Sequence, residues 1–219
     1  MDQIIPALLA RTHTELHDLY LSLDHAAPHL HLDIADGSMT ESILFGDPSF
    51  ITDHMTEETI ELHIMMRDPR TAINAFKNTP HVTGVCVHTE SEHIVEALDM
   101  ANEASWRTTI VLSPNSPTHA IETYAAQIDR ILIMGVMPGT QGAPWIPDMI
   151  EKAHTLSVRF PHITLAWDGG ITARRIPMLH QSGVSEYCVG SSIFQTSNPK
   201  EAYMALQNTL NQLTMVQKA

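Results

Sequence analysis

The 219-residue sequence predicts one α/β domain, a (β/α)8 TIM barrel that spans residues 1–219. Short β-branched or leucine-rich runs alternate with longer segments of helical period, and the alternation repeats eight times. No linker, charge block or low-complexity tract interrupts it. A doubly wound sheet would carry an early glycine-rich turn, whereas the first run here ends without a glycine, which favours the barrel.

Each strand is predicted from its own run of β-branched and leucine residues, bounded by polar or turn residues. In chain order the predicted strands cover residues 4–9, 29–34, 60–65, 82–88, 108–112, 130–136, 162–167 and 186–189.

The connecting helices are predicted from their start signals. Thr12 precedes the first helix, Ser91 precedes an apolar stripe at helical spacing, and Asn198 precedes the last helix. A helix over 117–127 begins with a proline, which is compatible with a first turn. Residues 47–59 have irregular apolar spacing and are expected to form only a short helix.

The composition excludes several classes of partner. Twelve Lys and Arg residues stand against 25 Asp and Glu, giving a net charge of −13, so a nucleic-acid partner is not expected. The start of the chain lacks a secretory leader, and no run approaches the roughly 18 apolar residues of a membrane span. We therefore expect a cytoplasmic protein without a membrane partner. Cys86 and Cys188 lie in apolar runs and are expected to be buried free thiols.

Four polar residues fall at the ends of predicted strands, where the chemistry of this fold is located. His31 and Asp33 are two residues apart and share one face of their strand, His63 lies near the end of the third strand, and Asp168 follows the seventh. Two imidazoles and two carboxylates could share a divalent cation such as Zn²⁺, Fe²⁺, Mn²⁺ or Co²⁺. Taken singly, a His or Asp in a strand is more often a structural or surface residue than a ligand.

Glycines follow the last three predicted strands. Small residues whose backbone N–H groups could bind phosphate occur at Gly139, Gly142, Gly169, Gly170, Gly190 and Ser191. Ordinary turns would also explain any one of these glycines. No lysine follows a predicted strand, so Schiff-base chemistry is not expected. His88 and Glu90 either orient metal ligands or are polar loop residues.

The order and spacing of these motifs resemble the ribulose-phosphate 3-epimerase family over nearly the whole chain. The motifs are HLDIADG (31–37), FG (45–46), LHIM (62–65), MGVMPG (134–139), WDGGI (167–171) and GSSIF (190–194). The resemblance implies a metal-dependent isomerase on a TIM barrel. It would interconvert D-ribulose 5-phosphate and D-xylulose 5-phosphate, or act on a six-carbon ketose phosphate.

The same resemblance implies roles for individual residues. The four strand-end residues, His31, Asp33, His63 and Asp168, would bind the divalent metal ion. Asp33 and Asp168 would also be the catalytic pair that moves protons on opposite faces of the sugar through an enediolate. The glycines and Ser191 would bind the substrate phosphate, with the Gly139 to Gly142 loop closing over it. Met65 and Met134 would line the pocket.

The resemblance also implies a homo-oligomer. Trp106 and Trp145 are candidate contact residues, although a single aromatic side chain more often packs within its own fold.

Among the departures from the family pattern, three bear on the substrate and on turnover, and Ala35 also replaces a third pocket methionine. Ala7 stands where the family has a serine, Met137 replaces an Asn or Glu before the Pro-Gly pair, and Ala143 replaces a glutamine. They leave two alternatives open: an allulose-6-phosphate 3-epimerase, and a non-catalytic phosphosugar-binding paralogue. The neighbouring orotidine-phosphate decarboxylase and hexulose-phosphate synthase group has an Asp-x-Lys-x-x-Asp motif, and this chain has Asp33 at the lysine position, so that chemistry fits poorly.

Overall fold

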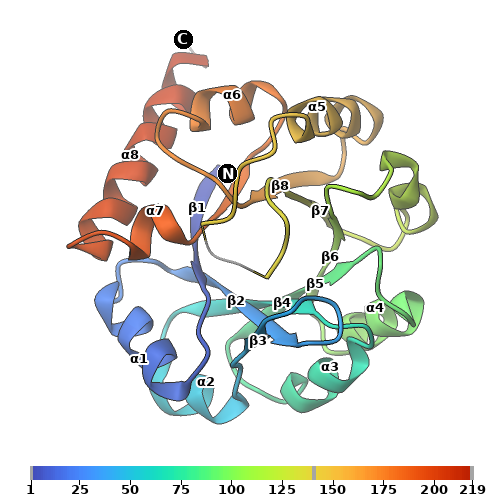
Figure 1. Ribbon diagram of the computed structural model, residues 1–219, viewed down its shortest axis with the longest axis vertical. Helices are drawn as coiled ribbons and strands as arrows, with labels where there is room; N and C mark the ends of the chain where they lie inside the picture. Colours follow the sequence, from blue (N-terminus) through green and yellow to red (C-terminus); the bar gives the residue numbers. More distant parts are fainter. Residues whose placement is uncertain (1, 140–141, 218–219) are drawn as a thin grey trace.

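Eight parallel strands close into a barrel in the computed structural model, which describes residues 2–139 and 142–217. The strands of the barrel are β1 (Gln3–Leu8), β2 (His29–Asp36), β4 (Thr59–Met65), β5 (Val82–His88), β6 (Arg107–Leu112), β7 (Arg130–Met134), β8 (Thr164–Asp168) and β9 (Glu186–Val189). Strand β1 pairs with both β2 and β9, which closes the ring (Figure 1). The predicted barrel is therefore confirmed.

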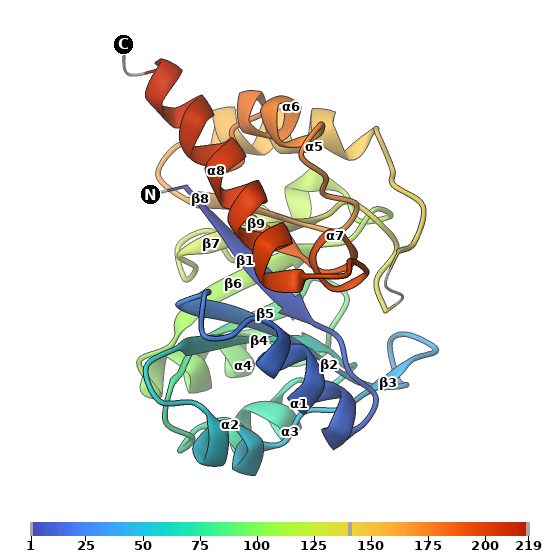
Figure 2. The same ribbon diagram turned by 90° about the vertical axis from the view of Figure 1, so that its left-hand side faces the viewer.

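Helices surround the barrel (Figure 1). They are α1 (His13–Ser22), α2 (Pro48–His54), α3 (Arg70–Phe76), α4 (Ile94–Glu103), the 3-10 helix η1 (Thr118–Thr123), α5 (Met149–Arg159), α6 (Ile176–Gln181), α7 (Ser191–Phe194) and α8 (Pro199–Gln217). Figure 2 shows α8 running along the outside of the barrel beside β1. The side-chain oxygen of Gln207 in α8 accepts a hydrogen bond of 2.9 Å from the Ile4 N–H of β1.

Apolar side chains fill both sides of the sheet. A large cluster that includes Leu16, Phe50 and Leu98 separates the strands from the helices. A smaller cluster that includes Leu132 and Ala166 fills part of the barrel interior. The alternation of inward and outward side chains along each strand therefore leaves only inward-facing residues available for chemistry inside the barrel.

Two predicted helix starts are confirmed. The Thr12 hydroxyl accepts a hydrogen bond of 3.2 Å from the Glu15 N–H, and the Glu15 carboxylate accepts one of 2.6 Å from the Arg11 N–H. The first bond satisfies one of the donors that every helix leaves free at its start, and the second fixes the residue before the cap. Asn198 accepts a bond of 3.2 Å from the Glu201 N–H in the same way.

Of three further local predictions, two were wrong and one was confirmed. Ser91 does not cap α4: its hydroxyl donates to the Met66 carbonyl at 2.9 Å, and α4 begins after His93, whose φ is 55°. The helix predicted over 117–127 is only the short η1, because Ile121 is the one buried side chain among its six residues. Residues 47–59 do contain a short helix, α2, as expected.

Strand ends differ by a few residues from the prediction. The strand predicted at 162–167 runs from Thr164 to Asp168, and the one predicted at 130–136 ends at Met134. The short strand β3 (Ile43–Leu44), which pairs antiparallel with the end of β2, was not predicted.

Trp106, a candidate contact residue, is buried. No helix in the described part of the chain is both long and apolar enough to cross a membrane.

Candidate active site

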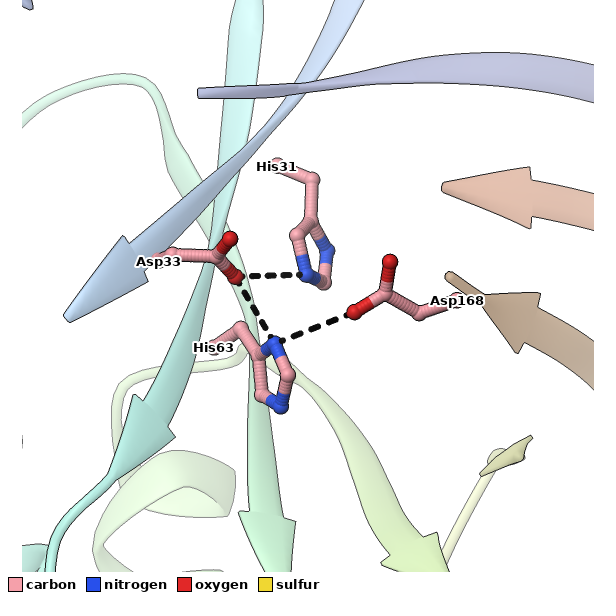
Figure 3. Close-up of side chains that lie close together, drawn as sticks. All are labelled: His31, Asp33, His63 and Asp168. Carbon is pink, nitrogen blue, oxygen red and sulfur yellow. Dashed lines mark hydrogen bonds and ion pairs between the residues drawn. The ribbon is translucent and has the colours of Figure 1, made fainter. Parts of the chain in front are cut away.

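Four side chains converge at the carboxyl ends of the strands, and we call them the rim cluster: His31 and Asp33 from β2, His63 from β4, and Asp168 from β8. One ligand atom from each lies within 4.8 Å of every other. In Figure 3 the two carboxylates point toward the same space as the two imidazole rings. The sheet register explains part of this, because Asp33 is directly opposite His63 on the neighbouring strand.

Distances within the rim cluster fit a site that binds one ion. Asp33 Oδ1 lies 2.9 Å from His63 Nδ1 and 3.5 Å from His31 Nε2. His63 Nδ1 lies 3.6 Å from Asp168 Oδ2. His31 Nε2 is buried and makes no hydrogen bond within the described residues. A buried nitrogen without a hydrogen bond, facing two carboxylates, is the arrangement expected of a metal ligand, and the nitrogen and oxygen donors suit a first-row divalent ion.

In both rim-cluster histidines, the ring nitrogen on the side away from the cluster has a hydrogen-bond partner. His31 Nδ1 lies 2.6 Å from Glu61 Oε1. His63 Nε2 lies 2.9 Å from His88 Nε2, and His88 Nδ1 lies 3.1 Å from the Ser113 hydroxyl. Such outer partners fix the orientation and tautomer of a metal-binding histidine.

His88 is fully buried, and burial lowers its pKa to about 4 despite the nearby Glu90 carboxylate. A neutral His88 that donates from Nδ1 can accept the Nε2 proton of His63, which leaves His63 Nδ1 free to face the rim cluster. Glu90 Oε2 lies 3.6 Å from His88 Nδ1, on the outer side of the ring. Of the two possibilities for His88 and Glu90, the positions are those of groups that orient a ligand.

The two aspartates have opposite electrostatic environments. Burial opposes ionisation of Asp33, but the neighbouring His31 and His63 rings outweigh it, and the pKa of Asp33 lies below its usual range. Burial, followed by the negative charge of Asp33, raises the pKa of Asp168 to about 6. Two neighbouring carboxyl groups with separated pKa values can serve as base and acid in the same site.

A pocket of about 550 Å³, counted to its open mouth, lies over the rim cluster. Its lining includes Met65 and Met134 and all six predicted phosphate-site residues, namely Gly139, Gly142, Gly169, Gly170, Gly190 and Ser191. His31 is fully buried behind this lining. Residues 140–141, inside the loop predicted to close over the substrate, lie outside the described residues.

The loop after β8 has a fixed backbone conformation. Gly169 and Gly170 have φ values of 95° and 67°, which favour glycine. Trp167 Nε1 donates to the Gly169 carbonyl at 2.8 Å, and the Arg175 guanidinium donates to the Gly170 carbonyl at 2.5 Å. Arg175 also stacks 4.2 Å above the ring of Trp145, which packs against Gly170. Both carbonyls are therefore bonded to side chains, and the peptide planes of the loop are set before any ligand binds.

Three buried charged residues inside the barrel were not predicted. Arg130 contacts Glu61 and lies 2.7 Å from Glu186, and Arg107 lies 2.8 Å from Glu186. We call Glu61, Arg130, Glu186 and Arg107 the barrel floor. The alternation in 60–65 places Glu61 on the same face as His63, which was a usable signal. Pairing between Glu61 and Arg130, 69 residues apart, cannot be deduced from local pattern.

Comparisons with known proteins agree with this geometry. The sequence profile of the "Ribulose-phosphate 3 epimerase family" matches residues 3–194. Ribulose-phosphate 3-epimerase of Schizosaccharomyces pombe is 24% identical over 214 residues, covering 95% of this chain and 93% of that protein. The enzyme of the same name from Helicobacter pylori is 27% identical over 214 residues, covering 94% and 97%.

Solved structures with the same fold are more distant in sequence. The 3-hexulose-6-phosphate synthase of Salmonella typhimurium superposes with a TM-score of 0.73 at 14% identity, covering 97% of this chain and 100% of that one. Orotidine 5'-phosphate decarboxylase of Pyrococcus horikoshii superposes with a TM-score of 0.69 at 15% identity, covering 95% and 99%. At these identities the likeness concerns the barrel alone.

Proposed function

The chain belongs to the ribulose-phosphate 3-epimerase family, and from that premise we propose that it is a metal-dependent 3-epimerase of ketose phosphates. Its preferred reaction is the interconversion of D-ribulose 5-phosphate and D-xylulose 5-phosphate. The observation that carries the proposal is the rim cluster, in which two imidazoles and two carboxylates lie within 4.8 Å of one another beneath an open pocket.

The residues present fit a divalent cation. His31, Asp33, His63 and Asp168 would hold it, since the set offers two nitrogen and two carboxylate donors and one of those nitrogens is buried without a hydrogen bond. When bound, such an ion stabilises negative charge that develops on the substrate oxygens. Zn²⁺, Fe²⁺, Mn²⁺ and Co²⁺ all accept these donors.

The two aspartates supply the proton transfers. Asp33, held ionised by its imidazole partners, takes the C3 proton from one face of the sugar. Asp168, whose pKa is raised to about 6 and so lies closer to neutral pH, delivers a proton to the other face. Inversion at C3 requires such a pair on opposite sides, and in the reverse reaction the two residues exchange roles.

The glycine loops would bind the phosphate. Gly169, Gly170, Gly190 and Ser191 line the pocket at the ends of β8 and β9, where barrels of this type commonly bind phosphate through backbone N–H groups. No Lys or Arg is among the residues that line the described pocket. The backbone would therefore provide most of the attraction for the phosphate.

Two alternatives rest on the departures from the family pattern. Ala7 and Met137 both line the pocket, so a hydroxyl at one position and a polar side chain at the other are replaced by apolar groups. This change favours either a six-carbon substrate, allulose 6-phosphate, or a protein that binds phosphosugars without turnover.

A cytoplasmic location and a homo-oligomeric state remain predictions.

Deuterium incorporation distinguishes these functions. The metal-loaded protein is incubated with D-ribulose 5-phosphate in D₂O, and NMR or mass spectrometry detects deuterium at C3. The proposal predicts label at C3 in both pentulose phosphates. Label with allulose 6-phosphate alone would assign the six-carbon substrate. Binding of both sugars without label would contradict an epimerase and support the non-catalytic alternative.

A further inference from the structure

Glu61 is the only described carboxylate hydrogen-bonded to the back of a rim-cluster histidine. It is 1% exposed, and its Oε1 atom lies 2.6 Å from His31 Nδ1. An ionised carboxylate only accepts hydrogen bonds, so Nδ1 must carry the proton of this bond. The other nitrogen of the ring, Nε2, is then the one that faces Asp33 and the rim cluster.

Arg130 fixes the orientation of the Glu61 carboxylate. Its buried guanidinium contacts the second oxygen of Glu61 and lies 3.2 Å from Cys86 Sγ. His31, Glu61 and Cys86 could themselves hold a metal ion, because one ligand atom from each lies within 4.8 Å of the others. The Arg130 cation contacts two members of that set. A second cation placed there would be repelled by Arg130 and would have to displace its bonds.

We propose that Glu61 is a positioning residue that selects the nitrogen of His31 presented to the metal, and that Arg130 holds Glu61 in this role and keeps the lower His31, Glu61 and Cys86 set free of metal. The inference rests on the proposed metal-dependent function. It adds a determinant of metal affinity that lies outside the pocket lining, on the inner side of the barrel wall.

Glu186 provides a matched control within the same charged network. It is 6% exposed, lies 2.7 Å from Arg130 and also bonds Arg107. Among the described residues it has no bond to His31. Neutralising Glu186 therefore disturbs the same buried arginine as neutralising Glu61, without touching a rim-cluster histidine.

Glu61→Gln has a directed effect on His31. An amide has one oxygen and one NH₂ group, so it cannot accept from both Arg130 and His31. Arg130 has only donors and a fixed charge, so the amide oxygen turns to Arg130 and the NH₂ group faces His31 Nδ1. Nδ1 then has to accept a hydrogen bond, the proton moves to Nε2, and the nitrogen that faces the rim cluster loses its lone pair.

The test measures Zn²⁺ affinity by competition with a chelating indicator in wild type, Glu61→Gln and Glu186→Gln. We expect Glu61→Gln to weaken binding about 10- to 100-fold, the usual range for outer partners of metal-binding histidines. We expect Glu186→Gln to stay within about threefold of wild type, well below that range. Equal affinity in the two variants would overturn the role of Glu61. Wild type that binds no divalent ion would instead overturn the proposed metal site.

A second measurement needs no variant. In Zn²⁺-loaded wild type, ¹⁵N NMR of the histidine rings is expected to show a proton on His31 Nδ1 and zinc on Nε2. A zinc-bound Nδ1 would overturn the inference, because the metal would then occupy the lower set that Arg130 is proposed to keep free. This result holds whether or not Glu61→Gln folds.

Discussion

The rim cluster and the barrel floor are two groups of charged residues inside one barrel, and they differ in how their negative charges are balanced by positive ones. The floor sets two carboxylates against two guanidinium groups, and Arg130 makes bonds to Glu61, Glu186 and Thr109. The rim cluster brings two carboxylates together with two imidazoles, and one of its nitrogens has no hydrogen bond. The charges of the floor are paired as the chain folds, whereas under the proposed function the rim would be completed by a cation.

This difference separates stability from function. Charges that are already paired in a buried site contribute to the native state only while all partners remain. Charges that face one another without a partner make the native state less stable and a bound ion more favourable. Variants of the rim should therefore affect activity more than folding, and variants of the floor should do the reverse.

The largest effect is expected from neutralising a rim aspartate. Asp33→Asn and Asp168→Asn should each lower C3 proton exchange about 100- to 10,000-fold, because a positioned acid or base contributes that much. The metal content is expected to change little, since an amide oxygen can still bind a cation. The measurement is deuterium incorporation, together with metal analysis. Asp36→Asn, an exposed residue at the end of the same strand, is the control and should retain full exchange. Retained exchange in both rim variants would contradict the two-aspartate account.

Replacing Arg130, the central arginine of the floor, should have the largest effect on stability. Arg130→Met removes the guanidinium that contacts both Glu61 and Glu186. Glu61 then remains as a buried charge without its cationic partner, so the free energy of unfolding should fall by about 3–5 kcal/mol. Denaturant unfolding at neutral pH measures it. Arg107→Met is the control: the Arg107 side chain is 31% exposed and Glu186 keeps Arg130, so its cost should stay below about 1 kcal/mol. Similar losses in the two variants would show that the buried pairing does not stabilise the barrel.

In the metal-free protein, neutralising Asp168 should raise the free energy of unfolding at neutral pH, the opposite of neutralising a charge in the floor. The pKa of Asp168 is raised to about 6, so its contribution to stability is full below about pH 4 and is lost as the pH rises through 6. Metal-free Asp168→Asn should match wild type near pH 4 and exceed it at pH 7 by on the order of 3 kcal/mol, since each pKa unit corresponds to about 1.4 kcal/mol. Asp33→Asn should be less stable than wild type at pH 7, because the pKa of Asp33 is lowered. Chemical unfolding after chelation, repeated across this pH range, tests both signs. A wild type more stable than Asp168→Asn at pH 7 would contradict the unbalanced rim.

The smallest effect is expected at the loop after β8. Gly170→Ala introduces a Cβ 2.6 Å from Trp145 at a φ of 67°, which costs about 1–2 kcal/mol and shifts the loop. We expect KM for the ketose phosphate to rise about tenfold, which corresponds to about 1.4 kcal/mol. Gly183→Ala is a matched control, because its φ is 97° and its Cβ would lie 2.4 Å from Ser157, away from the pocket. It should lose stability and keep KM. A raised KM in both variants would mean that the change at Gly170 is not local.

The barrel was predictable because its strands are short apolar runs that repeat at a regular interval. The rim cluster was equally accessible: His31 and Asp33 share a face by alternation, and His63 and Asp168 end their strands. Failures occurred where local pattern does not decide the structure. Ser91 looks like a helix cap but bonds Met66 on a neighbouring loop.

The barrel floor was not predicted for the same reason. Glu61 stands within an apolar run, and Arg130 and Glu186 each begin one, where a buried charged residue is unusual. Their pairing depends on three strands that meet only after the barrel closes. The strand β3 was also beyond the sequence, since two residues carry no periodic signal.

Anomalous diffraction from crystals grown with Mn²⁺ or Zn²⁺ tests the central claim most directly. The account predicts a single strong peak bound by His31 Nε2, His63 Nδ1 and one oxygen each from Asp33 and Asp168. A peak between His31, Glu61 and Cys86, or none among the four rim side chains, would contradict it.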